Sequence, residues 1–361
     1  MKIKSLLLAI VLLFTLCFAL VSCDKAVVVY EKSEDGSSYV VKGTKGQIAP
    51  DVVIPAEYKG LPVTAIGDSA FASSSITSIS IPASVTTIGQ EAFYYNTKLT
   101  SITFEEGSQL ESIGYRAFVK CESLTEIAFP EGLKTLSSNA FERSGLTSVV
   151  IPNSVTTVNH QVFRSCDSLK SVTLGTGITE FGSQVFGSCP ALTSVVIPDN
   201  IKTLNSTFER CTSLRSVKVG NGVTEMNYAF QGCTALNSVT IGNSVTQMNY
   251  AFDECTSLLE VTIPGTAVQM EGAFRGCTKL KTATFESGVF VVSDEEFSKC
   301  SSLETINFPS TLKTICNNAF GYCDAIKTIN FGGSKADWEA VRIDSGNSKI
   351  KDVVPNYNSY L

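Results

Sequence analysis

The sequence contains one histidine, one tryptophan and few charged residues, which make up 17% of its 361 positions. A serine–histidine triad needs an imidazole beside both a nucleophile and a carboxylate, and catalytic zinc sites usually draw on two or more imidazoles. His160 lies between Asn159 and Gln161 at an expected corner of the chain. We therefore expect an exposed loop residue there, and these shortages exclude most histidine-based and zinc-based catalysis.

Basic charge and phosphate-binding loops are also missing. The net charge is −6, so the chain has no surplus of cations to neutralise a nucleic-acid backbone. No glycine-rich loop is followed by Lys-Ser or Lys-Thr, and no pair of carboxylates recurs at a catalytic spacing. The sequence favours a protein that is not an enzyme, carries no cofactor or metal, and does not bind nucleic acid.

What the sequence has in abundance is repetition. Phenylalanine recurs in steps of 22 or 23 residues, with one step of 25, at Phe71, Phe93, Phe118, Phe141, Phe163, Phe186, Phe208, Phe230, Phe252, Phe274, Phe297 and Phe320. A fixed period in this range is the signature of a solenoid. A repeat stack also explains the length, because each coil contacts only its neighbours and the stack has no size ceiling.

Each repeat predicts the same local elements. The alternation in residues 124–130 predicts a strand with one face buried, and the Pro or Gly that follows it in most units marks a corner. Residues 245–248 exemplify a second short strand. A Gly or Asn after this strand predicts a corner with positive φ, at Gly67, Gly89, Gly114, Asn159, Gly182, Asn205, Asn227 and Asn249. The Ala-Phe-x-x-Cys segment predicts one helical turn held by its phenylalanine.

The predicted fold is a β-rich solenoid of about twelve coils over residues 53–331, each coil with two short strands and one helical turn. Residues 23–52 are predicted to form an N-terminal cap, with a β-hairpin of 26–30 and 39–41 around the turn at 34–37. Residues 332–361 are predicted to form a C-terminal cap in which Trp338 covers the last phenylalanine layer. The units in residues 204–274 are one residue shorter before the phenylalanine, so we expect a different curvature there.

The first 22 residues are predicted to be a signal peptide, because two lysines precede an apolar run that is short for a membrane-spanning helix. The residues Leu20-Val21-Ser22-Cys23 resemble the lipobox of bacterial lipoproteins, in which the cysteine is diacylated. This resemblance implies lipidation at Cys23 and attachment to a membrane. The alternatives are an ordinary signal peptide and a single anchor helix.

Nine cysteines occupy one repeat column: Cys121, Cys166, Cys189, Cys211, Cys233, Cys255, Cys277, Cys300 and Cys323. Parallel side chains about 4.8 Å apart neither converge on a metal nor reach the Cβ separation of about 3.8 Å that a disulfide needs. We expect buried, reduced thiols that donate to nearby carbonyls, with metal or redox chemistry as the alternative. Asn96 in the same column could meet the same backbone need, and Cys316 in the Gly column is expected to be partly exposed.

Two features of the expected surface are candidate binding sites. The outward row of the main strand is weakly charged and includes Thr173, Val196, Lys218, Thr240, Thr262 and Thr284. This row suits either a docking face for a protein or glycan, or simply a solvated strand. Tyr228 and Tyr250 form an aromatic column outside the core, which suits either an interface or local packing.

The columns Cys-x-x-Leu-x-x-Ile-x-Ile-Pro-x-x-Val-x-x-Ile-Gly-x-x-Ala-Phe resemble the BspA-type leucine-rich repeats, also called the Treponema pallidum class. The resemblance covers about residues 53–350. It implies a surface lipoprotein of a bacterial cell envelope that binds a host matrix or plasma protein, and it brings no catalytic residues. Alternatives are a structural scaffold of the envelope and a glycan-capture module.

Overall fold

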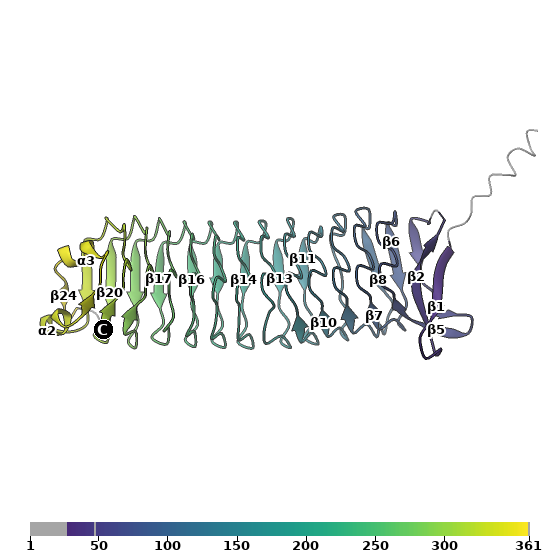
Figure 1. Ribbon diagram of the computed structural model, residues 1–361, viewed down its shortest axis with the longest axis horizontal. Coiled ribbons are helices and arrows are strands. Elements are labelled where there is room, and N and C mark those ends of the chain that lie inside the picture. Colours follow the sequence, from purple (N-terminus) through teal and green to yellow (C-terminus); the bar gives the residue numbers. More distant parts are fainter. Residues whose placement is uncertain (1–26, 47, 360–361) are drawn as a thin grey trace, which may run out of the picture.

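The computed structural model describes residues 27–46 and 48–359, and these form one straight stack of coils (Figure 1). The stack is a β-solenoid of about 14 turns with little helix. A hairpin lies at one end and two short helices lie at the other. The predicted signal peptide and Cys23 lie outside the described residues.

The main strands follow one another along one side of the stack and pair in parallel, in register. Most of them bury alternate side chains, as the sequence pattern predicts. These strands are β3 (Asp51–Val53), β6 (Ser78–Ile81), β8 (Ser101–Phe104), β11 (Ser148–Val150), β13 (Ser171–Thr173), β14 (Ser194–Val196), β15 (Ser216–Lys218), β16 (Ser238–Thr240), β17 (Glu260–Ile263), β18 (Thr282–Phe285), β20 (Thr305–Phe308), β22 (Thr328–Phe331) and β24 (Asn356–Tyr357).

A second series of shorter strands forms another side of the stack. It comprises β5 (Leu61–Ile66), β7 (Thr87–Ile88), β9 (Ser112–Ile113), β10 (Thr135–Leu136), β12 (Thr157–Val158), β19 (Val291–Val292), β21 (Thr314–Ile315) and β23 (Arg342–Ile343). Between β12 and β19 this pairing is reduced to single bridges, such as Thr203 with Glu225. The different curvature expected for residues 204–274 stays a prediction.

The phenylalanine column forms a continuous stack inside the solenoid. All twelve rings are buried, with consecutive centroids 4.9–5.6 Å apart and planes tilted by no more than 14°. Offset stacking of this kind adds to the apolar area that each ring removes from water. The ring stack confirms the predicted core.

The predicted helical turn around each phenylalanine is wrong. In every one of the twelve coils the residues two before and two after the phenylalanine have positive φ, as at Tyr228 (58°) and Gly232 (72°) around Phe230. A residue with positive φ cannot lie in a right-handed helix, so the segment is a pair of tight turns. Its main-chain N–H groups donate to the next coil instead, as Phe230 does to Ala251.

The expected positive φ in the Gly/Asn column is also wrong, because none of those eight residues has it. Glycine is needed there because consecutive coils approach closely: a Cβ on Gly89 would lie 2.8 Å from the Asp68 nitrogen. Asparagine serves at the same corner in another way. The Oδ1 of Asn205 accepts the Asn227 N–H at 3.0 Å, and the Oδ1 of Asn227 accepts the Asn249 N–H at 2.9 Å.

Both predicted caps are present. Strands β1 (Val27–Lys32) and β2 (Tyr39–Lys45) form the antiparallel hairpin, and β2 pairs in parallel with β5, which also pairs with the short β4 (Glu57–Tyr58). At the other end, helix α2 (Lys335–Glu339) places Trp338 against Phe308 and Phe331. Trp338 thus covers strand phenylalanines rather than the repeat column. The N–H of Phe320, the last member of that column, donates to Oδ1 of Asn347, just before α3 (Ser348–Asp352).

The strand predicted in residues 124–130 is absent, so the main sheet is broken between β8 and β11. The residues there still alternate between buried and outward positions, with Leu124 and Phe129 inside. The alternation of apolar residues in the sequence predicts only which side chains are buried. Whether the strand pairs with its neighbours also depends on the distance to the neighbouring coils, which the sequence pattern does not contain.

One buried carboxyl interrupts the column of small side chains that precedes the phenylalanines, whose other members are alanine, valine and one threonine. Glu296 is fully buried, its Oε2 accepts the Ser293 N–H at 2.8 Å, and its Oε1 has no hydrogen-bond partner. Burial raises the pKa of this carboxyl well above its usual value. Glu296 is therefore held in the protonated form until the pH exceeds that raised value.

Replacing Glu296 by glutamine should change how stability depends on pH. A carboxyl with a raised folded-state pKa contributes its full stability below the unfolded pKa of about 4.3, and this is lost as the pH rises through the folded pKa. The variant avoids this loss. Its free energy of unfolding should therefore exceed that of the wild type by an amount that grows from near zero at pH 4 to roughly 1–3 kcal/mol at pH 8. Urea unfolding between pH 4 and 8 measures this difference, with exposed Glu254→Gln as the control. A difference that does not vary with pH contradicts the prediction.

Candidate functional site

The outward row of the main strands is exposed from Thr173 to Thr262, whereas Thr284 is half-buried and its Oγ1 accepts from Asn307 at 2.8 Å. Strand pairing places Val196, Lys218 and Thr240 side by side on β14, β15 and β16, and Thr262 beside Thr284 on β17 and β18. Thr173 pairs with Val150 on β11. Pairing is interrupted between β13 and β14 and between β16 and β17, so the row spans three sheets. The row is an extended, rigid surface, and Val150 and Val196 are each more than 60% exposed on it.

The two tyrosines of the second candidate site do stack on each other. The ring centroids of Tyr228 and Tyr250 are 5.2 Å apart with planes tilted by 10°. The Tyr250 hydroxyl donates to Oε1 of Glu271 at 2.7 Å, and this bond raises the pKa of Tyr250 to about 12. A Cβ on Gly272 would lie 2.4 Å from the Tyr250 ring, so this glycine makes room for it. Local packing therefore explains Tyr250, while Tyr228 remains 41% exposed.

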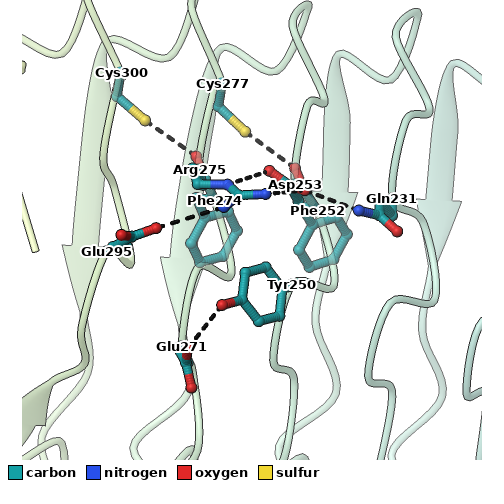
Figure 2. A network of polar contacts seen from close by, with 10 residues as sticks. All are labelled: Gln231, Tyr250, Phe252, Asp253, Glu271, Phe274, Arg275, Cys277, Glu295 and Cys300. Carbon is teal, nitrogen blue, oxygen red and sulfur yellow. Dashed lines mark hydrogen bonds and ion pairs between the residues drawn. The ribbon is translucent and has the colours of Figure 1, made fainter.

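A polar network that was not predicted from the sequence lies on the turn side of the solenoid (Figure 2). Asp253 is almost completely buried, and Arg275 holds it with two hydrogen bonds of 3.0 Å. Gln231 donates to the same carboxylate at 2.9 Å, and Arg275 also reaches Glu295 at 3.4 Å. The Arg275 guanidinium lies 5.2 Å from the Tyr250 ring centroid. The sequence does contain an indication of this network, because Gln231, Asp253 and Arg275 each directly follow a repeat phenylalanine.

A second network on the same side links four consecutive coils from Asn139 to Glu209. Asn139 donates to Gln161, Gln161 to Gln184 and Gln184 to Glu209, over 3.0, 2.8 and 2.7 Å. Gln161 and Gln184 each accept from one neighbouring coil and donate to the other. These side chains tie coil to coil, so their role is structural.

The cysteine column is the thiol ladder that the sequence predicts. Each of the nine thiols donates to the carbonyl oxygen of a phenylalanine in the preceding coil, over 3.0–3.3 Å. Figure 2 shows two of these bonds, from Cys277 to Phe252 and from Cys300 to Phe274. Asn96 substitutes for the thiol by donating to the Phe71 carbonyl at 2.7 Å. The described cysteines are free thiols, and no cluster of metal-ligating side chains occurs among the described residues.

We predict that these column thiols react slowly in the native protein. Burial raises the pKa of Cys233 to about 12 and that of Cys166 to about 11, so the reactive thiolate is scarce at pH 8. Iodoacetamide labelling followed by mass spectrometry should leave the nine unmodified until denaturant is added. Half-buried Cys316 serves as the internal control and should be labelled first. Rapid native labelling of the column, or a bond between adjacent column cysteines, contradicts the prediction.

His160 is exposed, and its Nδ1 accepts the Ser183 N–H at 2.9 Å, as expected for a corner residue. Within the described part of the chain, no helix has the length and apolar character needed to cross a membrane.

The repeats match a family model described as the BspA type leucine-rich repeat region. The match comprises six copies, over residues 64–144, 95–215, 134–249 and 224–340, which is most of the chain. The chain belongs to the BspA-type leucine-rich repeat family. No curated protein matches this BspA-type chain at a significant level.

Three solved leucine-rich repeat structures are similar to this chain. A leucine-rich repeat protein from Bacteroides ovatus is 25% identical, with a TM-score of 0.67 and 88% of each chain covered. A leucine rich cell surface protein from Faecalibacterium prausnitzii is 26% identical, with a TM-score of 0.44, covering 88% of this chain and 96% of that one. The T. pallidum leucine-rich repeat protein is 26% identical, with a TM-score of 0.34, covering 64% of this chain and 87% of that one.

Leucine-rich repeat folds are typically non-catalytic scaffolds, and such proteins generally bind other macromolecules. A binding site of this BspA-type chain is therefore expected on an extended surface rather than in an enclosed pocket.

Proposed function

We propose that this BspA-type chain is an adhesin-like protein that docks another protein through the main-strand face between Thr173 and Thr284. The observation that carries the proposal is the exposed row itself. Paired strands hold Val196, Lys218 and Thr240 in register on a rigid backbone. Such a row presents a surface far longer than a small-molecule site, as repeat proteins commonly do.

The chemistry of the row suits a protein partner. Hydroxyl and aliphatic side chains predominate, and desolvating them costs less than desolvating a face rich in charges. Lys218 and Glu260 are isolated charges on this face that can set the register of a partner. Affinity would come from many modest contacts, so single threonine-to-alanine changes should have small effects.

The test is the binding of purified protein to fibronectin, fibrinogen and a glycan panel at physiological salt. The double variant Thr240→Arg with Thr262→Glu places bulky charges on the row and should abolish binding. The matched control is Thr234→Arg with Thr256→Glu, which adds the same charges to two consecutive coils on the adjoining corner. Equal binding by the row variant and the wild type refutes this face and leaves exposed Tyr228 as the better candidate.

Two other functions remain as outcomes of this experiment. Binding to the glycan panel alone supports a glycan-capture module. Binding to nothing in either panel supports a scaffold of the cell envelope, whose function lies in the rigid rod itself.

We further propose that two acyl chains on Cys23 anchor the protein in a bacterial envelope with the solenoid exposed at the cell surface. One acyl chain gives only marginal membrane attachment, whereas two give stable anchoring. Wild-type protein should incorporate labelled palmitate, and Cys23→Ala should lose both the label and the membrane fraction. A Cys23→Ala protein that stays membrane-bound, with an unlabelled wild type, contradicts the proposal.

A further inference from the structure

The break in the main sheet leaves a length of backbone without partners. Within the described residues, the main-chain groups of Glu126, Ile127 and Ala128 make no hydrogen bond to another main-chain group. The same coil is well held elsewhere: β10 pairs with both β9 and β12, and the Phe118 ring stacks at 4.9 Å on both neighbours. The coil therefore lacks backbone pairing only on the main-strand side.

The missing bonds can be identified from the other coils. Ile54 donates its N–H to the Ser80 carbonyl of the next coil, and Ile151 does the same to Thr173, each over 3.0 Å. The equivalent bond across the break would run from Phe104 to Ala128, and it is absent among the described residues. Two backbone edges with unused donors and acceptors thus face each other, one on β8 and one on residues 126–128.

A groove lies over β8, residues 126–128 and β11. A hollow of about 440 Å³ is lined by all three, with Ser148 and Val150 coming from β11, and a second hollow of about 300 Å³ shares Ala128 and continues to the turn at Gly107. Ile102 and Ile127 line the first hollow and are only partly buried, whereas most residues of their column are fully covered. The groove therefore has an apolar floor and backbone walls.

The charge of the groove has one sign. Glu126 lines one hollow, and Glu105 and Glu131 line the other, while neither hollow is lined by a lysine, arginine or histidine. None of these three carboxylates takes part in an ion pair within the described residues. A cationic partner is thus favoured over a neutral or acidic one.

We propose that this groove binds an extended, basic peptide segment of another protein as an added β-strand. The peptide's main chain would use the free donors and acceptors of β8 and residues 126–128, as in other cases of strand addition. Alternate apolar side chains would contact Ile102 and Ile127, and the intervening lysines or arginines would face the glutamates. Four extended residues match β8 (Ser101–Phe104) at roughly 3.3 Å per residue, and a six-residue peptide would also reach the end at Glu105. This site lies in different coils from the docking face proposed above.

The other interruptions of the main sheet do not offer the same site. Between β13 and β14, and between β16 and β17, strands lie on both sides of the gap and remain in contact. Only at residues 124–130 is the strand itself missing among the described coils.

The probe is the fluorescently labelled peptide acetyl-Val-Lys-Val-Lys-Val-Lys-amide, titrated into the purified protein and followed by fluorescence anisotropy. Two comparison peptides separate the contribution of charge from that of main-chain hydrogen bonds. One replaces lysine by glutamate, and the other carries N-methyl groups on the three valines. N-methylation keeps the charge but removes hydrogen-bond donors along one edge. We expect saturable binding of the first peptide and at least tenfold weaker binding of both others.

Protein variants locate the site. Glu126→Lys should weaken binding at least tenfold, whereas Glu260→Lys, in the same outward column on the paired strand β17, should not. Both residues are exposed, so both variants should fold, which circular dichroism can verify. Hydrogen exchange should slow at the amides of residues 126–128 when the peptide is bound. The Thr240→Arg with Thr262→Glu protein should bind the peptide normally, so this result and that for the docking face are independent.

Three outcomes overturn the proposal: no saturable binding of the lysine peptide to the wild type, equal binding of the N-methylated peptide, or equal weakening by Glu126→Lys and Glu260→Lys. A dimer in sedimentation that dissociates in Glu126→Lys and excludes the peptide would also overturn it, because the occupant would then be a second copy of the chain.

Discussion

Replacing Phe230 by alanine is expected to lower the free energy of unfolding by about 3–5 kcal/mol. The ring is fully buried in the middle of the stack, between Phe208 at 5.6 Å and Phe252 at 5.5 Å. Removing it loses the transfer free energy of the side chain and leaves a cavity. The coils on either side cannot close that cavity, because their main chains are held in register by β15 and β16.

Urea unfolding followed by circular dichroism measures this loss. Because a long repeat array can unfold in stages, hydrogen exchange should also show local opening around the altered coil. The control is Tyr322→Ala, which removes an aromatic ring that is 74% exposed and should change stability by less than about 0.5 kcal/mol. Similar losses for the two variants would mean that the ring stack does not carry the stability we assign to it.

Replacing Arg275 by methionine is expected to cost about 3 kcal/mol or more, because it leaves the carboxylate of Asp253 buried with only Gln231 as a side-chain partner. The Asp253 side chain is 1% exposed and has no route to bulk water without a rearrangement of its coil. The double variant Arg275→Met with Asp253→Asn removes both charges. It should recover a large part of the lost stability.

The matched control is Arg164→Met. Arg164 occupies the same repeat position, and its side chain is 34% exposed, as is that of Arg275. Its partner Glu142 lies farther away, at 3.5 Å, and is 18% exposed, so solvent screens the pair. We expect a loss below about 1 kcal/mol. Equal losses for the two arginines would show that the burial of the partner does not set the cost.

The phenylalanine stack and the polar network around Asp253 affect function because they make the solenoid rigid. The ring stack and the turn-side polar contacts link each coil to the next, so the main-strand face can present a fixed row of side chains to a partner. A rigid face pays little conformational entropy when it binds. The break at residues 124–130 is the place where this regularity stops, and there the backbone itself becomes available.

Several features followed from the sequence because they depend on repetition. The twelve phenylalanines fixed the coil length, and the buried stack confirms their column. The thiol ladder followed from spacing alone, including the role of Asn96 as a substitute donor. The outward position of Thr173, Val196, Lys218, Thr240 and Thr262 followed from alternation. Whether that row or Tyr228 binds a partner is still a prediction.

Other features required coordinates, because they depend on how far apart neighbouring coils lie. The turn around Phe230 is not helical, since its N–H groups bond to the next coil, and no local pattern shows that preference. The pairing of Asp253 with Arg275 depends on two side chains 22 positions apart meeting across coils.

The same distinction applies to the groove. Residues 124–130 have the alternating pattern that is typical of a strand, yet they form no strand pairing with β8 or β11. By itself the sequence determined the repeat, the core columns and which side chains face outward, because a periodic pattern of apolar residues encodes burial. Only the tertiary structure decided where the sheet continues and where it opens, because hydrogen bonds between coils form or fail over differences of a few ångströms in backbone separation.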